Sequence, residues 1–76
     1  MKSDPLSVNK RNILQIYAEE LELSKLEPSD DFFEVGGNSI TMARIQARLK
    51  DELGLHVTLE TLFTYTTVQT LAKNIE

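Results

Sequence analysis

The sequence predicts an all-α fold: a small four-helix bundle of three main helices and one short helix, with a long ordered loop between the first two. Apolar residues recur at the spacing of three and four that builds one face of a helix, and no segment sustains the alternation of period two that is typical of strands. The 76 residues suffice for one small domain. We therefore expect a single domain over residues 1–76, with residues 1–6 as a flexible arm.

The first helix is predicted to begin after Ser7, as its N-cap, and to end at about Leu21. Its apolar residues form one stripe at about 100° per residue, which we assign to the core. The stripe consists of Ile13, Leu14, Tyr17 and Leu21, with Ile16 beside it.

Residues 22–38 form the long loop. A connection of this length without secondary structure is usually functional or disordered. Five apolar residues favour an ordered loop held against the bundle, namely Leu23, Leu26, Phe32, Phe33 and Val35. We assign both phenylalanines mainly to the core.

The second helix is predicted from Ser39 to about Leu53, with Gly54 at the left-handed position that follows a helix end. Its core stripe consists of Met42, Ile45, Leu49 and Leu53. Gln46 projects near this stripe, and the sequence offers no reason for it.

Two shorter helices complete the bundle. Thr58 is expected to cap the short third helix, and Thr67 the last one. The inward residues of the third helix are predicted to be Leu59, Leu62 and Phe63. Those of the last helix are Val68, Leu71, Ala72 and Ile75.

The composition argues against several classes of protein. No cysteine is present, which excludes disulfides, iron–sulfur clusters and thiolate zinc sites. The single histidine, His56, would need surrounding carboxylates to bind a metal, and we expect no metal. The net charge of −4 argues against a nucleic-acid partner, and no apolar run approaches the roughly 18 residues that a membrane span needs. We expect a monomeric, cytoplasmic protein.

Charge is distributed unevenly along the chain. Residues 19–34 contain seven acids and one base. Residues 40–50 contain no acid and three bases, Arg44, Arg48 and Lys50. The simplest interpretation is two solvated surfaces of opposite sign.

The run Gly36-Gly37-Asn38-Ser39 precedes the second helix. Glycine adopts positive φ without steric cost and lets another molecule approach the backbone. Ser39 is thereby presented at a helix N-terminus, where free N–H groups and the helix dipole favour an anion such as a phosphodiester. The alternative is that Ser39 only caps the helix, but Met42 stands where a capping box would have Glu or Gln.

Ile40 lies opposite the core stripe of the same helix, together with Arg44. An isolated exposed isoleucine needs no explanation. Next to Ser39, and with Arg44 and Arg48 behind it, Ile40 indicates a surface for docking.

The run from Asp31 to Ile40, Asp-Phe-Phe-Glu-Val-Gly-Gly-Asn-Ser-Ile, closely resembles the core motif of the peptidyl carrier domains of nonribosomal peptide synthetases. The resemblance extends over essentially the whole chain. This chain departs from the family pattern at Val35, where Leu is commoner, at Asn38, where His or Asp is commoner, and at Thr66, where a proline often precedes the last helix. Asn38 and the bases of the second helix distinguish it from fatty-acid carriers, whose second helix is acidic.

The resemblance implies a protein that catalyses nothing itself. Ser39 would carry 4′-phosphopantetheine covalently, presented by the loop of Gly36, Gly37 and Asn38. A phosphopantetheinyl transferase would attach this arm, and its thiol would carry amino-acyl or peptidyl thioesters between adenylation, condensation and thioesterase enzymes. The residues expected to dock these partners are Ile40, Arg44, Arg48 and Leu62.

Three alternatives stay open. An acyl or aryl carrier of a polyketide or siderophore-type pathway would share most of these features. A helical interaction module with Ser39 as a cap predicts no covalent modification. An enzyme with Ser39 as nucleophile would need a base, and His56 is the single histidine available for that role. The cargo and the pathway cannot be read from the sequence.

Overall fold

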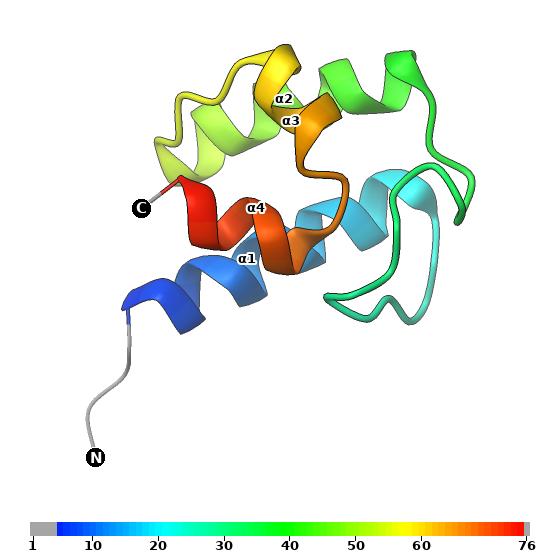
Figure 1. Cartoon of the computed structure of the whole chain (residues 1–76), viewed down its shortest axis with the longest axis horizontal. Coiled ribbons are helices and arrows are strands. Elements are labelled where there is room, and N and C mark those ends of the chain that lie inside the picture. Colours follow the sequence, from blue (N-terminus) through cyan, green and yellow to red (C-terminus); the bar gives the residue numbers. More distant parts are fainter. Residues whose placement is uncertain (1–4, 76) are drawn as a thin grey trace.

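The computed structural model describes residues 5–75 and contains four helices (Figure 1): α1 (Pro5–Leu21), α2 (Ser39–Leu53), α3 (Leu59–Thr64) and α4 (Val68–Asn74). Within this range no strand forms, and an isolated antiparallel bridge joins Asp31 to Thr67. The predicted all-α bundle with a long loop between the first two helices is confirmed.

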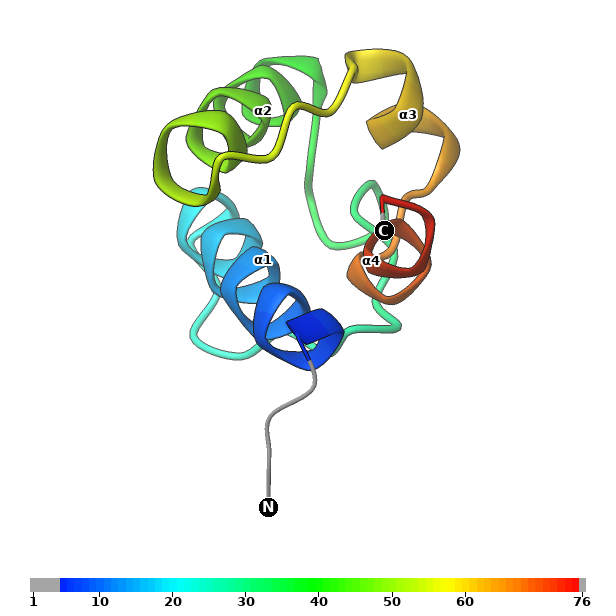
Figure 2. The same ribbon diagram turned by 90° about the vertical axis from the view of Figure 1, so that its left-hand side faces the viewer.

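The helices surround one apolar core. α1 packs against α2 and α4, and α2 also packs against α3. Figure 1 shows α1 and α2 running in opposite directions, and the end-on view of Figure 2 shows the four helices arranged around the interior. The largest fully buried side chains are Ile13, Tyr17, Phe32, Met42, Ile45, Leu49, Leu62, Val68 and Leu71.

Local signals in the sequence set most helix boundaries. The side chains of Thr58 and Thr67 accept hydrogen bonds from the backbone N–H groups of residues 61 and 70, as N-caps do. Gly54 ends α2 in the left-handed conformation with φ of 68°. These three predictions are confirmed.

The start of α1 is different from the prediction. The helix begins at Pro5, so Ser7 lies inside it and the predicted cap at Ser7 is wrong. Proline suits the first turn of a helix because its missing N–H would have no partner there. Of the arm predicted over residues 1–6, residues 5 and 6 belong to α1, and residues 1–4 lie outside the described part of the chain.

The long loop is ordered, as predicted. Phe32 inserts its ring into the core with 1% of its surface exposed. The backbone of the loop is tied to the C-terminal part of the chain, because Phe32 N–H donates to the Thr66 carbonyl (2.8 Å) and Gln69 N–H donates to the Pro28 carbonyl (3.0 Å). Since Thr66 and Gln69 flank the start of α4, the loop is fixed against that helix.

Three aromatic and aliphatic residues predicted to face the core are instead partly exposed, namely Phe33, Leu59 and Phe63. α3 packs against α2, and of its apolar side chains Leu62 reaches the interior while Leu59 and Phe63 lie at the surface. In the loop, Phe32 fills the space beneath the turn and Phe33 points outward. The core assignments of Phe33, Leu59 and Phe63 are therefore wrong.

Gln46 bonds to the connection between α2 and α3. Its side-chain Nε2 donates to the Val57 carbonyl at 2.8 Å. Val57 is buried at this point, so the bond satisfies a carbonyl that has little access to water. This explains a polar residue beside the core stripe of α2.

Two kinds of feature are absent from residues 5–75. None of the helices in this range combines the length and apolar character needed to cross a membrane. The same range holds no group of three or more His, Asp or Glu side chains placed to bind a metal ion.

Candidate functional site

The two glycines before α2 serve different geometric needs. Gly36 has φ of 110°, a conformation that side chains disfavour. Gly37 lies against the Phe32 ring, where an added Cβ would overlap carbons of the ring. The loop can therefore pass closely over the buried ring and enter α2 only with glycine at both positions.

Asn38, and not Ser39, is the N-cap of α2. Its Oδ1 accepts hydrogen bonds from the N–H (2.9 Å) and the hydroxyl (3.2 Å) of Thr41. The backbone of Asn38 is extended, as a cap requires, and its carbonyl accepts from Met42 N–H at 2.9 Å. The hydroxyl of Ser39 is thus left out of the capping bonds.

Ser39 occupies the first helical position of α2 and is exposed. The first N–H groups of a helix have no partner within the helix, and the dipole adds positive potential at this end. The first turn of α2 contains no acidic residue that would oppose an anion. The position suits a phosphate group on the Ser39 oxygen.

Asp31 organises the loop that leads to Ser39. Its Oδ2 accepts hydrogen bonds from the N–H groups of Phe33 (3.0 Å) and Glu34 (3.2 Å), and its Oδ1 accepts one from the Thr66 hydroxyl. The Thr66 hydroxyl, followed by these backbone donors, holds the pKa of Asp31 below its usual value. The charged carboxylate of Asp31 therefore links the loop to the segment before α4.

Exposed apolar side chains lie beside Ser39 in sequence and on the neighbouring α3. Ile40 is 67% exposed, and Phe33 and Phe63 are each 42% exposed. The rings of Phe33 and Phe63 are stacked, with 5.8 Å between centroids and 10° between planes. Arg44, one turn after Ile40, is also exposed. Ser39 is thus followed in α2 by an exposed isoleucine and an exposed arginine, and an exposed aromatic pair joins its loop to α3.

Comparison with known families gives a match over residues 11–75 to the family described as "Phosphopantetheine attachment site". The chain belongs to this family. The matched range includes the Gly-Gly-Asn-Ser run and all of α2, α3 and α4. The resemblance predicted from the sequence is confirmed, and so is the cofactor class that it implies, 4′-phosphopantetheine.

Curated relatives of this carrier domain are synthetases. It is 36% identical over 64 residues to one of the subunits of linear gramicidin synthase from Brevibacillus parabrevis, which is 84% of this chain and 1% of the relative. It is 35% identical over 71 residues to one of the subunits of plipastatin synthase from Bacillus subtilis, covering 93% of this chain and 3% of the relative. The carrier domain thus spans a very small part of these proteins.

Solved structures share its fold. BlmI, a type-II acyl-carrier protein of Streptomyces verticillus involved in bleomycin biosynthesis, matches with a TM-score of 0.86 and 27% identity, over 92% of this chain and 84% of that one. The McyG A-PCP structure complexed with phenylalanyl-adenylate matches with a TM-score of 0.82 and 33% identity, over 99% of this chain and 11% of that one. The carrier domain has the helical bundle of both.

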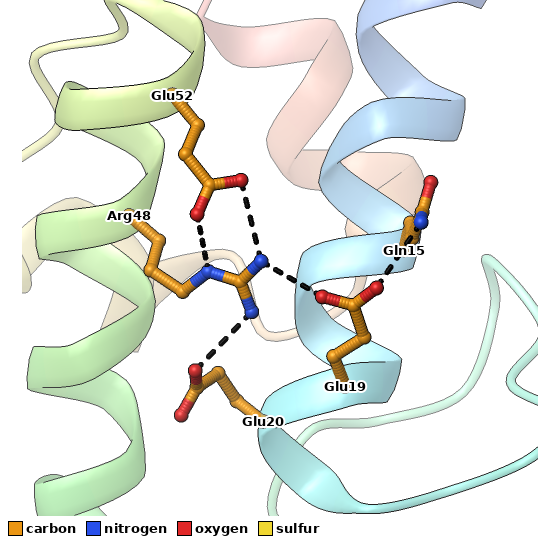
Figure 3. A network of polar contacts seen from close by, with 5 residues as sticks. All are labelled: Gln15, Glu19, Glu20, Arg48 and Glu52. Atoms are coloured by element: carbon orange, nitrogen blue, oxygen red, sulfur yellow. Dashed lines mark hydrogen bonds and ion pairs between the residues drawn. The ribbon is translucent and has the colours of Figure 1, made fainter.

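Two of the residues expected to dock partners are placed elsewhere by the structure. Leu62 of the carrier domain is fully buried in the core, so its side chain is not available to a partner. Arg48 donates to Glu52 of its own helix (2.7 Å) and, across the helix pair, to Glu19 (2.7 Å) and Glu20 (3.2 Å), as Figure 3 shows. Ile40 and Arg44 remain exposed candidates.

The Arg48 cluster accounts for part of the uneven charge in the sequence. The acids at the end of α1 and the base in α2 meet at the interface of the two helices, where the Arg48 side chain is 27% exposed. Bonds to Glu52 and Glu19 raise the pKa of Arg48, and the Arg48 and Gln15 side chains lower the pKa of Glu19. This cluster connects α1 to α2.

Sequence reasoning missed Phe33, Phe63 and Thr66 of the carrier domain as residues that shape the site. The sequence carried no signal that Phe32 would be buried and Phe33 exposed, because irregular loop backbone has no fixed side-chain period. For Thr66 the sequence carried one signal, its departure from the proline of the family pattern. Its bond to Asp31 joins residues 35 positions apart, and a single sequence does not show such pairings.

Proposed function

We propose that Ser39 carries 4′-phosphopantetheine and that the chain tethers amino-acyl or peptidyl thioesters in nonribosomal peptide biosynthesis, without catalysing a step itself. The observation that carries this proposal is the exposed Ser39 hydroxyl at the N-terminus of α2, which the Asn38 cap leaves uncommitted. Membership in the phosphopantetheine attachment family supplies the chemical class.

The residues around Ser39 support a modified serine better than a nucleophile of an enzyme. His56 lines an open surface cavity with Gln46 and Lys50, about two turns of α2 from Ser39. Ser39 therefore has no histidine base within reach in the described structure, and a base from the transferase would take the hydroxyl proton. The Ser39 oxygen would bond to the phosphorus that carries the pantetheine arm of coenzyme A, and adenosine 3′,5′-bisphosphate would leave as the phosphoanhydride bond breaks. The first turn of α2 would hold the resulting phosphodiester through its N–H groups and dipole.

When attached, 4′-phosphopantetheine supplies a flexible arm that ends in a thiol and holds the cargo as a thioester. The chain's own contribution is to fix the attachment point on a rigid helix end. A tethered intermediate meets each partner at an effective concentration that can reach about millimolar. Ile40 and Arg44, with the Phe33–Phe63 pair, would form the surface that partners contact.

The proposed partners are a phosphopantetheinyl transferase and adenylation, condensation and thioesterase enzymes or domains. The McyG structure, which joins an adenylation domain to a peptidyl carrier, supports the adenylation partner. Membership in the phosphopantetheine attachment family supports the transferase. Similarity to peptide synthetases supports the condensation and thioesterase partners. We also propose a cytoplasmic location, because the transferase requires coenzyme A as the donor of the arm.

An acyl carrier is the second candidate. BlmI, a type-II acyl-carrier protein, matches the fold well, and hybrid polyketide–peptide synthetases are among the relatives. Loading of the modified chain by a panel of adenylating enzymes and of acyltransferases distinguishes the two. Amino-acyl loading alone supports the peptidyl assignment, and acyl loading alone overturns it.

The test of the modification is an intact-mass measurement after incubation with coenzyme A and a promiscuous phosphopantetheinyl transferase. The wild type should gain one phosphopantetheine and Ser39→Ala none. Ser24→Ala, which changes another exposed serine in the loop, is the matched control and should be modified like the wild type. No mass gain in the wild type would overturn the carrier function, and a gain in Ser39→Ala would overturn the site.

A further inference from the structure

Thr66 lies between α3 and α4 and bonds through two of its groups to the loop of residues 22–38, here called the Ser39 loop. Its carbonyl accepts from Phe32 N–H at 2.8 Å, and its hydroxyl donates to Oδ1 of Asp31. The other oxygen of Asp31 accepts from the N–H groups of Phe33 and Glu34. The Thr66 hydroxyl therefore bonds to the same carboxylate that shapes the turn of the loop.

The two residues that this bond joins lie close to the exposed aromatic pair. Phe33 is two residues after Asp31, and Phe63 is three residues before Thr66. Their rings stack with 5.8 Å between centroids although both are 42% exposed. The bonds of Thr66 to Phe32 and Asp31 join the segment directly after α3, the helix that carries Phe63, to the loop that carries Phe33.

We propose that Thr66 is a positioning residue for recognition at Ser39: its hydroxyl, bonded to Asp31, fixes the end of α3 against the loop of residues 22–38 and keeps the Phe33–Phe63 pair assembled for the phosphopantetheinyl transferase. The inference rests on the proposed modification of Ser39. It assigns to Thr66 no contact with the reacting atoms.

The Thr66 hydroxyl acts on the fraction of molecules in which the aromatic pair is assembled. Without the Thr66 hydroxyl, the loop and α3 stay connected by the Phe32–Thr66 backbone bond and by apolar contacts, so the fold persists. The carboxylate of Asp31 loses a donor, and charge-assisted bonds of this kind are among the stronger ones in proteins. The fraction of molecules with the aromatic pair assembled falls, and the apparent affinity of a partner falls by the same factor.

The test compares three variants in the transferase reaction. Thr66→Val removes the hydroxyl and keeps the branched shape, and Thr66→Ser retains the hydroxyl. Thr64→Val is the matched control, because the Thr64 hydroxyl bonds within α3, to the Glu60 carbonyl at 2.8 Å. We expect Thr66→Val to raise the KM for the carrier by about three- to tenfold with little change in kcat. Thr66→Ser and Thr64→Val should stay near the wild type.

Hydrogen exchange of single amides gives a readout that does not depend on any partner. The N–H groups of Phe33 and Glu34 should exchange faster in Thr66→Val than in the wild type and Thr66→Ser, while amides in the core of α1 and α2 remain protected. Circular dichroism checks that the helices are retained. Unchanged exchange at both amides would overturn the role of the hydroxyl in fixing the loop.

The outcomes separate this inference from the function on which it rests. No modification of the wild type would overturn the carrier function. Normal modification of the wild type, with a wild-type KM for Thr66→Val, would overturn the inference alone. If Thr66→Val does not fold, Thr66→Ala takes its place, because it removes the same hydroxyl and leaves Asp31 unchanged. A wild-type KM for Thr66→Ala would then overturn the inference.

Discussion

The Cα of Gly37 faces the ring of Phe32 so closely that a methyl group in place of its hydrogen would overlap the ring carbons. Phe32 cannot turn away easily, because it is buried and meets the Tyr17 ring edge-on with 5.8 Å between centroids. The loop before Ser39 is therefore shaped by a contact between a glycine and a core side chain.

Gly37→Ala should destabilise the fold by about 1–3 kcal/mol, since it overpacks a filled core. The displaced ring should also loosen the loop, so amides around Phe32 should lose protection from hydrogen exchange. Urea denaturation measures the stability. A change within about 0.5 kcal/mol of the wild type, the range of ordinary surface substitutions, would contradict the prediction.

The Tyr17 hydroxyl is buried and has no hydrogen-bond partner among the described residues. Burial raises the pKa of this hydroxyl. Because an unsatisfied buried hydroxyl costs free energy, Tyr17→Phe should leave stability unchanged or increase it by about 1 kcal/mol. Tyr65→Phe, at a half-buried tyrosine, is the comparison in the same urea titration. Clear destabilisation by Tyr17→Phe would show that a water molecule satisfies the hydroxyl.

Arg48 and Arg44 lie one turn apart on α2 and should behave differently. Arg48→Gln removes two ion pairs between α1 and α2 and one within α2. This substitution should lower the melting temperature by about 3–8 °C, and by less at high salt. Arg44→Gln should leave the melting temperature unchanged and raise the KM of the transferase reaction. Equal melting temperatures for the two variants would show that the cluster contributes nothing to stability.

The free energy of unfolding should decrease at acid pH. The pKa values of Asp31 and Glu19 are lower in the folded protein than their ordinary values of 3.8 and 4.5. Groups with a depressed pKa stabilise the fold above their unfolded pKa, and this contribution is lost as the pH falls below about 4.5. Urea midpoints at pH 7 and pH 3 measure the loss. The loss should be smaller in Arg48→Gln, which lacks the partner of Glu19, and an equal loss would contradict the assignment.

Ile40→Asp should impair modification and loading without affecting the helices. The side chain is 67% exposed, so the substitution removes an apolar contact with partners and little packing. We expect kcat/KM of the transferase reaction to fall about tenfold, the effect of losing a contact of about 1.4 kcal/mol. Gln69→Asp adds the same charge on the exposed face of α4 and is the control. Loss of helix content in Ile40→Asp would show that Ile40 supports the fold.

Residues whose role depends on local chemistry could be predicted from the sequence. The limits of α2, the caps at Thr58 and Thr67 and the left-handed Gly54 follow from side chains within a few residues of each helix end. The N-cap of α2 could not be predicted in this way, because asparagine and serine are both good caps and Asn38 and Ser39 are adjacent. The structure selects the residue with an extended backbone.

Residues whose role depends on distant partners could not be predicted. The sequence marked Arg48 as part of a basic docking surface, but Glu19 and Glu20 bind it across the helix interface. Leu59 and Phe63 fit an inward stripe by spacing, yet α3 turns only Leu62 into the core and leaves both at the surface. Ion pairing and burial at these positions depend on which helices pack against each other, and a single sequence does not show this.

Because Asn38 caps α2, folding of this chain does not depend on whether Ser39 is modified. The residue that stabilises the start of α2 differs from the residue proposed to be modified, so the bare serine form does not need the added group to fold. An attached phosphodiester would place its negative charge at the N-terminus of α2, where the free N–H groups can bind an anion. Newly synthesised chains would accordingly form a reservoir of folded substrate, and the transferase would recognise a finished surface and not an unfolded segment.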